Sequence, residues 1–316
     1  MTARWVGPLM AVVGVFGFSA KAILVKLAYA WHPIDAVTLL ALRMLYSAPF
    51  FLAMVWWASR RPDARRLSRA DGKRLVLLGF IGYYLSSLLD FMGLAYITAA
   101  LERLVLYLYP TIVVVLSALL LGKAITGRAV TALMLSYAGI VLVFVHDLNV
   151  SGSPTAVWTG GTLVFLCAIL YALYLVLAGD VIARIGSMRF ISWAMLASTA
   201  FVALQFVLTR EPGLLRAPAA IQALALAMAV FCTVLPTWLI AEAIGRIGAN
   251  ASSLVGSLGP VFTIALGAII LGEAVHWIQL VGTAFVLAGV TLTTLRPDIR
   301  GPAAADQPGL GLPRKP

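Results

Sequence analysis

The residues of this chain that could do chemistry stand inside long apolar stretches of its first half. Lys21, Lys26, Arg43, Asp90 and Glu102 all fall within or at the edge of such stretches. A charge at the centre of a bilayer costs about 2.5–3.5 kcal/mol unless it meets a partner or a cavity. The basic residues could bind a carboxylate or phosphate, and the acidic ones an amine or a proton. Alternatively, the charges could neutralise one another as purely structural pairs.

Small polar and aromatic side chains accompany these charges at helical spacing. Tyr83 and Ser87 precede Asp90 by seven and three residues, so a helix would present all three on one side. The second half carries a face of small polar residues: Asn250, Ser253 and Ser257. A site that is charged on one side and small and polar on the other would suit a zwitterion. These residues and the five charges are therefore the candidate substrate-binding residues.

Two prolines, Pro110 and Pro260, lie in the middle of apolar stretches of the two halves. A proline within a helix removes a backbone donor and crowds the preceding turn, which would leave carbonyl groups near Leu106 and Gly256 without helical partners. In a membrane such groups must be satisfied by protein or by cavity water. We expect a pair of hinges beside a cavity or, alternatively, simple helix bends.

Sequence motifs of enzymes, ATP-driven pumps and metal sites are missing. The chain has no HExxH, GxSxG or P-loop pattern and no paired histidines at ligand spacing. Its two cysteines, Cys167 and Cys232, lie in apolar runs without a neighbouring His or Cys, which disfavours a zinc site or a disulfide framework. We expect no enzymatic activity, no metal and no other cofactor.

Composition sets the class of protein. Of the 316 residues, 62% are hydrophobic and 11% are charged. An average soluble domain has about 45–50% apolar and about 25% charged residues. The chain therefore has too little polar surface for a soluble globule and too much apolar content for a disordered chain. These numbers indicate a polytopic membrane protein.

Ten stretches are long and apolar enough to cross the bilayer, which takes a helix of about 20 residues. Those of the first half are Trp5–Ala30, Ile34–Ala58, Leu75–Tyr96, Ala99–Leu121 and Ile125–Val145. Those of the second half are Trp158–Gly179, Phe190–Thr209, Ala219–Ala243, Ala249–Leu271 and Trp277–Leu295. The sequence thus predicts an all-α integral membrane protein with ten transmembrane helices. Residues 297–316 are rich in Pro, Gly and Ala and are expected to form a disordered cytoplasmic tail.

Basic residues sort to one side of this topology. The net charge of +11 arises from 23 Lys and Arg against 12 Asp and Glu. With a cytoplasmic N-terminus most basic residues, including those of the Arg-rich segment Ser59–Arg74, fall on the cytoplasmic side, as is usual for membrane proteins. Arg103, Arg210 and Arg216 fall on the outer side. The charge thus indicates a multi-pass protein of the cell membrane (the inner membrane in a bacterium) with both termini in the cytoplasm, not a nucleic-acid-binding protein.

The rise of 1.5 Å per residue estimates how deep each buried charge lies. Lys21 and Arg43 would lie about 13 Å from the outer boundary, Asp90 about 9 Å and Lys26 about 6 Å. Glu102 would lie only about 4 Å in, within reach of water. Lys21 and Lys26 are about 140° apart around their helix, so we expect only one of them to face any one pocket.

The chain repeats itself at an offset of 150 residues. Residues 100–145 align with residues 250–295 without a gap, and Pro110 meets Pro260. Each half has five spans, an odd number, so the second half enters the membrane from the opposite side and the repeats would be inverted. Secondary transporters recurrently use inverted repeats, with the substrate site near the midplane where the repeats meet.

Several segments are similar to one known family. The segments are FGFSAKAILVKLA, TLLALRML with Arg43, GLAYITAALERLVLYLYPTIVVVLSALLLGK and AIGRIGANASSLVGSLGPVFTIALGAIILGE. Their order resembles a drug/metabolite transporter of the EamA type, built from two EamA repeats, over roughly residues 9–145 and 158–295. The first repeat departs from the family's Leu-Gly-Glu ending, since Lys123 stands where the second repeat has Glu273. The resemblance implies two five-helix repeats around a central cavity that opens alternately to each side.

We therefore expect a first repeat over residues 1–147 and a second over residues 148–296. The leading interpretation is a secondary transporter that exports a small, amino-acid-like metabolite by alternating access, with buried carboxyl groups available for coupling to protons. An anion exchanger for phosphorylated metabolites or nucleotide sugars would use the same basic residues. A membrane scaffold or lipid-binding protein without transport is the interpretation from another class. Expected partners are a small-molecule substrate, the lipid bilayer and protons as coupling ion.

Overall fold

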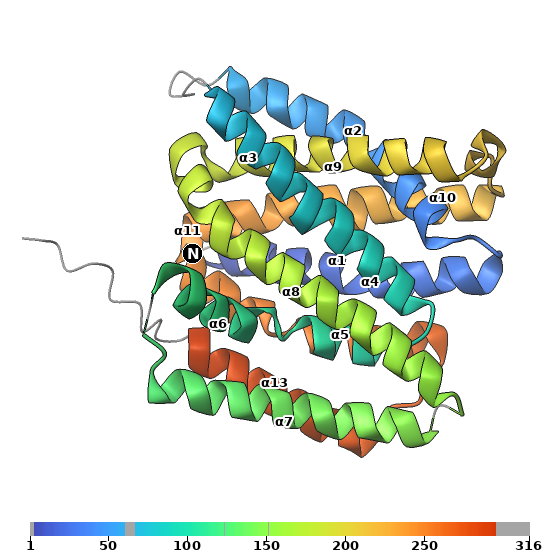
Figure 1. The fold of residues 1–316 in the computed structure, drawn as a ribbon, viewed down its shortest axis with the longest axis vertical. Helices are drawn as coiled ribbons and strands as arrows, with labels where there is room; N and C mark the ends of the chain where they lie inside the picture. The colour runs from blue at the N-terminus through green and yellow to red at the C-terminus, as the bar shows by residue number, and fades with distance from the viewer. Residues whose placement is uncertain (1–2, 61–66, 123, 151, 295–316) are drawn as a thin grey trace, which may run out of the picture.

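The protein is helical throughout the part of the chain that the structure describes. A computed structural model describes residues 3–60, 67–122, 124–150 and 152–294 (Figure 1). Within these ranges, nine helices are long and apolar enough to cross a membrane, and a further apolar helix, α13 (Trp277–Thr294), is shorter. The chain is therefore a multi-pass membrane protein. The count of ten spans stays a prediction, and the predicted tail over residues 297–316 lies outside the described residues.

The described residues of the first half form seven α-helices and one π-helical turn. They are α1 (Ala3–Trp31), α2 (Ala36–Ser59), α3 (Arg69–Gly79), the π-helical turn η1 (Phe80–Leu85), α4 (Ser86–Leu94), α5 (Ala99–Leu106), α6 (Tyr109–Leu121) and α7 (Gly127–Val150). α3, η1 and α4 run on as one candidate span, and α5 and α6 together form the next.

Residues 152–294 of the second half form six α-helices, one 3₁₀ turn and two π-helical turns. They are α8 (Pro154–Ile185), α9 (Ser187–Thr209), the 3₁₀ turn η2 (Pro212–Leu215), α10 (Ala219–Ala229), the π-helical turn η3 (Val230–Val234), α11 (Leu235–Gly256), α12 (Gly259–Leu266), the π-helical turn η4 (Gly267–Leu271) and α13. α11 contains one non-helical residue, Gly248, with φ 82°.

Local sequence signals set several helix ends. The Asp35 side chain accepts hydrogen bonds from two backbone N–H groups at the start of α2, and the Thr98 side chain accepts one at the start of α5. Such N-caps satisfy donors that the helix itself cannot. Gly122 ends α6 with φ 65° and Gly272 ends η4 with φ 66°. Only glycine adopts this left-handed conformation at little cost, which explains the glycine at both positions.

The elements of the two halves correspond at an offset of 150 residues. α3 covers 69–79 and α10 covers 219–229, and η1 and η3 begin at 80 and 230. The first residues of α6 and α12, and of α7 and α13, have the same offset. Each half thus repeats the same order of helices, including a π-helical turn inside its third span. Such turns are frequent at functional sites.

A break in the helix precedes each of the two candidate hinge prolines. Pro110 lies in the first turn of α6 and Pro260 in the first turn of α12, each after a two-residue break. A proline in a first turn removes no helical hydrogen bond, because the N–H groups there have no helical partner. The expectation that the prolines lie in the middle of helices is therefore wrong, whereas the expectation that the Gly256 carbonyl lacks a helical partner and is satisfied by protein agrees with the structure. The Gly256 carbonyl accepts a hydrogen bond from the Tyr107 hydroxyl, which joins the two breaks.

Helices of the two halves pack against each other at several places in the bundle. α2 packs against its counterpart α9, and α7 packs against its counterpart α13. α1 packs against α11 in the same way as α8, the counterpart of α1, packs against α4. In Figure 1, α2 and α9 lie at the upper edge of the bundle, α7 and α13 at the lower edge, and α1 and α11 between them. The middle of the bundle is therefore shared by both halves.

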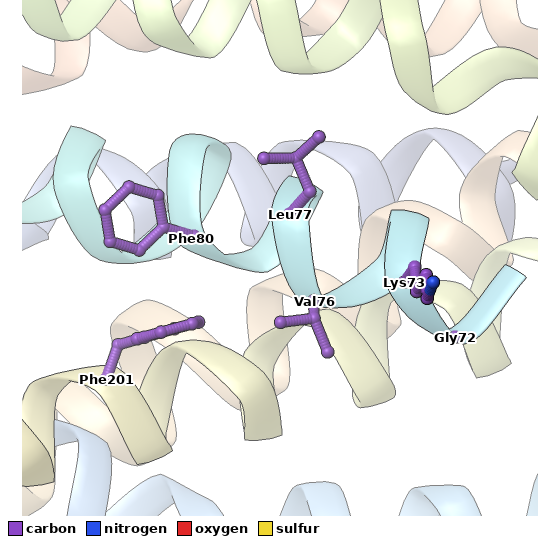
Figure 2. A pocket seen from close by; sticks show the side chains of 6 residues that line it. All are labelled: Gly72, Lys73, Val76, Leu77, Phe80 and Phe201. Atoms are coloured by element: carbon purple, nitrogen blue, oxygen red, sulfur yellow. The ribbon is translucent and has the colours of Figure 1, made fainter. Parts of the chain in front are cut away.

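A groove of about 590 Å³ lies on the outer surface between α3, η1 and α9. Figure 2 shows its lining, which is apolar except for Lys73 at one end and includes Phe80 and Phe201. A second groove beside it shares Gly72 and Val76. Both open on the outside of the bundle, where a membrane protein meets lipid, so neither is the predicted central cavity. That cavity stays a prediction.

Candidate functional site

A cluster of ion pairs joins α1, α4 and α5 in the interior. The Nζ atom of Lys21 lies 2.5 Å from Oδ2 of Asp90 and 3.7 Å from Oε1 of Glu102. Asp90 is 2% exposed and Glu102 is fully buried. A buried charge without a partner is strongly destabilising. The ammonium group of Lys21 therefore makes it possible to bury the two carboxyl groups. The structure thus brings together three of the candidate residues.

Arg103 extends this cluster to the second half of the chain. Its Nε atom lies 3.9 Å from Oε2 of Glu102 and donates a 3.0 Å hydrogen bond to the Thr263 hydroxyl of α12. Its Nη2 group donates a 2.8 Å hydrogen bond to the Phe18 carbonyl of α1. The Ser19 hydroxyl completes the contact by donating to the Gly259 carbonyl at the start of α12. The cluster therefore lies where α1 and α5 meet the second half.

Two expectations based on depth along the spans are wrong. Glu102 does not reach water, and Arg103, expected on the outer side, is only 6% exposed. Every residue from Ala99 to Val105 is buried, because other helices surround α5 on all sides. Distance from the end of a helix therefore does not measure distance from water at this position. The sequence signal that was missed is that Arg103 directly follows Glu102 inside an apolar stretch.

Lys26 belongs to a separate contact near the end of α1. Its Nζ atom donates a 2.7 Å hydrogen bond to the Ile97 carbonyl and lies 3.7 Å from Oε1 of Glu273. The same Oε1 atom accepts a 3.0 Å hydrogen bond from the Ala99 backbone N–H at the start of α5. Lys21 and Lys26 thus contact different groups, whereas the expectation that only one of them faces any one pocket stays a prediction. Glu273 was a missed partner of Lys26, and Lys123, its counterpart in the first repeat, lies outside the described residues.

Arg43 of α2 is buried without an acidic partner. It is 5% exposed, and the ion pairs of the described residues include none that it makes. Its Nη2 atom contacts the Ser87 hydroxyl at 3.3 Å and the Met44 sulfur at 3.7 Å, and its Cζ atom lies 4.9 Å from the centre of the Phe91 ring. Its Nε atom is buried and has no hydrogen-bond partner. Arg43 is thus the unpaired member of the candidate set.

A row of tyrosines lies beside the charges. Tyr83 and Tyr174 share a 3.0 Å hydrogen bond between their hydroxyl groups. The rings of Tyr171 and Tyr174 are stacked with centres 5.7 Å apart, and Tyr109 meets Tyr171 edge to face at 5.1 Å. Tyr107 continues the row at 6.1 Å from Tyr109. These rings from η1, the α5–α6 break, the start of α6 and α8 form an aromatic wall, of which Tyr83 was the candidate member.

The polar face expected around Asp90 is divided among several partners. Ser87 binds Arg43, Tyr83 binds Tyr174, and the Ser86 hydroxyl lies 3.2 Å from the Cys167 sulfur. In the second half, the side chains of Asn250 and Ser253 lie outside the described part of the structure. The Ser257 hydroxyl donates to the carbonyl of Leu254 in its own chain segment at 2.6 Å. The predicted polar face of the second half therefore stays a prediction.

A further ion pair connects the two halves in the loops outside the spans. Asp35, the N-cap of α2, lies 3.1 Å from Nε of Arg210 at the end of α9. Partial burial acts to raise the pKa of Asp35, but hydrogen bonds from Thr38 and Arg210 outweigh it and lower the pKa below its usual value. The contact therefore joins α2 to its counterpart through a charged carboxylate.

The chemistry that the arrangement offers is binding and proton exchange. Arg43 has free donors for an anion, and the carboxyl groups of Asp90 and Glu102 retain three buried oxygen atoms without a hydrogen-bond partner. Among the residues that the structure describes, no group of three or more His, Cys, Asp or Glu side chains is placed to hold a metal ion. Charged groups that are buried and only partly satisfied inside membrane helices are typical of substrate or ion pathways.

Comparison with known proteins gives related sequences and a related fold. The chain is 28% identical over 301 residues to the uncharacterized transporter YcbK of Bacillus subtilis (strain 168), covering 92% of this chain and 94% of the relative. It is 24% identical over 258 residues to the uncharacterized transporter YetK of the same organism, covering 81% and 77%. A solved crystal structure superimposes with a TM-score of 0.64 at 18% identity, covering 92% of this chain and 96% of that chain. That likeness concerns the fold alone.

The family comparison matches both halves separately. The model of the EamA-like transporter family matches residues 5–145 and again residues 158–295. The two matches coincide with the two sets of helices that repeat at an offset of 150 residues. The resemblance seen in the sequence is thus confirmed, and the chain belongs to the EamA-like transporter family, with two EamA repeats.

Proposed function

We propose that this protein is a secondary transporter of the cell membrane that exports a small, amino-acid-like metabolite by alternating access. In this proposal, residues 1–147 and 148–296 form two inverted repeats of five spans around a central site. Both termini then face the cytoplasm, which agrees with the excess of basic residues on that side. The observation that carries the proposal is the buried ion cluster of Lys21, Asp90, Glu102 and Arg103 at the contact between the two halves.

The position of the cluster favours a moving interface. Arg103 of α5 reaches Thr263 of α12, and both helices border one of the two breaks. Tyr107 connects the breaks through the Gly256 carbonyl. Discontinuous helices at the substrate site are a recurrent feature of transporters built from inverted repeats. A rocking of one repeat against the other would rearrange these contacts and could expose the cluster to each side in turn.

The carboxyl groups of the cluster suit coupling to protons. Lys21 faces two of them at once, and neither oxygen of Glu102 has a hydrogen-bond partner. When two carboxyl groups lie close together, a second negative charge is costly, so one of the two groups binds a proton more readily than an isolated carboxyl group does. A proton entering from the outside could neutralise Glu102 and release Lys21 to the other carboxylate. In this proposal that step is linked to the release of substrate.

The test is efflux from proteoliposomes. Purified protein is reconstituted with an internal mixture of the twenty amino acids, and the loss of each is followed by mass spectrometry with and without an inward proton gradient. We expect faster loss of at least one amino acid than from protein-free liposomes, and acceleration by the gradient. In the Glu102→Gln variant the acceleration should vanish while exchange at equal pH persists. Equal loss from liposomes with and without protein would reject the proposal.

A further inference from the structure

The three basic residues that the sequence offers as anion ligands are not equivalent in the structure. Lys21 contacts two carboxyl groups, and Lys26 contacts Glu273 and a backbone carbonyl. Arg43 alone lacks an acidic partner within 4.0 Å among the described residues. The lysines are therefore occupied, and Arg43 is the one candidate left for an incoming anion.

The guanidinium group of Arg43 has a hydrogen-bond donor without a partner. Of its five N–H bonds, the two on Nη2 are directed to the Ser87 hydroxyl and the Met44 sulfur. Nε is buried and has no hydrogen-bond partner in the described part of the structure. A buried polar group without a partner costs free energy unless another molecule satisfies it. Planar guanidinium donors match the two oxygens of a carboxylate.

The surroundings of Arg43 also point to a site between the halves. The side chain lies over the Phe91 ring of α4, and its charge interacts at longer range with Asp90 of α4 and, more weakly, with Cys232 in η3 of the second half. At the offset of 150 residues the counterpart of Arg43 is Trp193 in α9, so the charge is present in one half only. A single cation held between helices of both halves is suited to bind a ligand that both halves must enclose.

The charge of the buried set decides how much negative charge the site can accept. In the state in which Asp90 and Glu102 are both ionised, their two negative charges offset two of the three positive charges of Lys21, Arg43 and Arg103, which leaves one excess positive charge, on Arg43. The contact of Lys26 with Glu273 is neutral by itself. One monoanion would bring the set to neutrality, whereas a dianion would leave a net negative charge in a medium that solvates it poorly.

We propose that Arg43, together with Ser87 and Phe91, is the subsite that binds a single carboxylate group of the transported metabolite and discriminates against phosphate dianions. The inference rests on the proposed function and names the substrate class that its site accepts. It also separates the leading interpretation from an exchanger of phosphorylated metabolites, which would need more than one free cation.

Simple anions test this subsite without any need for transport. The thermal unfolding midpoint of the full chain in detergent is measured against sodium acetate, sodium phosphate and sodium chloride, at constant ionic strength and about pH 8, where phosphate is mostly a dianion. We expect acetate to raise the midpoint at concentrations about tenfold lower than phosphate or chloride, because it forms two charge-assisted hydrogen bonds with Arg43. Chloride is the control for a site that accepts any small monoanion, because it carries one negative charge but lacks the two oxygen atoms of a carboxylate.

Variants assign the effect to Arg43. Arg43→Gln should abolish the shift caused by acetate, whereas Lys26→Gln, which removes a paired cation, should keep it. If Arg43→Gln does not fold, Ser87→Ala serves instead, and it should weaken acetate severalfold because the guanidinium loses the hydroxyl group that orients it. An acetate shift that survives in both Arg43→Gln and Ser87→Ala, or an equal shift by phosphate or chloride, would overturn the inference. Absence of efflux from proteoliposomes would instead reject the proposed transport and leave this binding result standing.

Discussion

Removal of the ammonium group of Lys21 should reveal how the buried cluster is held together. Coulomb's law with an effective dielectric constant of about 20 gives roughly 7 kcal/mol of attraction to Asp90 at 2.5 Å and roughly 4–5 kcal/mol to Glu102 at 3.7 Å. Desolvation of the charges offsets much of this attraction. The net cost of breaking a buried pair by removing one partner is about 3–5 kcal/mol. We expect Lys21→Met to lower the free energy of unfolding by that amount.

A double-mutant cycle separates the two contacts. Lys21→Met is combined with Asp90→Asn and, separately, with Glu102→Gln. Because the Asp90 contact is the shorter, the coupling free energy with Asp90 should reach about 2–3 kcal/mol and exceed that with Glu102. The double variant Lys21→Met with Asp90→Asn should be more stable than the sum of the single changes implies, since no buried charge is left unpaired by that pair.

The assay is reversible unfolding of the purified protein in mixed micelles with increasing SDS, followed by tryptophan fluorescence. Reaction of the buried thiols Cys167 and Cys232 with a fluorogenic maleimide gives an independent signal of opening. Lys26→Met is the matched control, because its side chain is 25% exposed and its contact with Glu273 should contribute less than about 1 kcal/mol. Additive single and double variants, with coupling below about 0.5 kcal/mol, would refute a direct ion pair between Lys21 and Asp90.

Two further predictions concern the contacts near the loops. Glu273→Gln keeps an acceptor for the Ala99 N–H and should lower the free energy of unfolding by less than about 1 kcal/mol, whereas Glu273→Ala also removes the acceptor and should cost about 1–3 kcal/mol more in the same SDS titration. The lowered pKa of Asp35 stabilises the fold above the usual carboxyl pKa of about 3.9, and this contribution is lost as the pH falls through the lowered value. Wild type should therefore melt at a higher temperature than Asp35→Asn at neutral pH, and a constant difference down to strongly acidic pH would contradict this.

Periodicity and composition predicted most of the architecture because the bilayer dictates it. Nine of the ten predicted stretches overlap a candidate span that begins within about six residues of the expected position, and the tenth overlaps the shorter apolar helix α13. The offset of 150 residues, first seen in residues 100–145, also relates the bounds of α3 and α10. Apolar length and small-residue packing are written into the local sequence, so both can be found without knowledge of tertiary contacts.

The breaks and the π-helical turns could not be predicted in the same way. Pro110 and Pro260 marked the region but not the helix ends, because a proline is compatible with a kink inside a helix and with a first turn after a break. The π-helical turns η1 and η3 carry no proline at their start, at Phe80 and Val230. Their presence depends on the packing of neighbouring helices, which a local pattern does not contain.

The pairing of the charges depends on which helices become neighbours. Depth along the spans left open which basic residue pairs with which carboxyl group, and the structure pairs Lys21 with both Asp90 and Glu102. Arg103 finds its partners on α1 and α12, which lie far from it in sequence. Rotation about a helix axis and the choice of neighbouring helix are tertiary properties. The sequence therefore indicated which charged residues are buried in the spans, but not which groups they contact.

The different partners of the lysines and of Arg43 suggest how the site could select its ligand. The lysines of α1 are neutralised by acidic residues of the protein itself, so an incoming anion would have to compete with carboxylates already in place. Arg43 makes no direct ion pair among the described residues and interacts with Asp90 only at longer range, so its burial raises the free energy of the empty site. Binding of a carboxylate would therefore relieve a cost that the folded chain already bears. A neutral ligand offers no such gain, which makes the unpaired guanidinium a source of both affinity and selectivity.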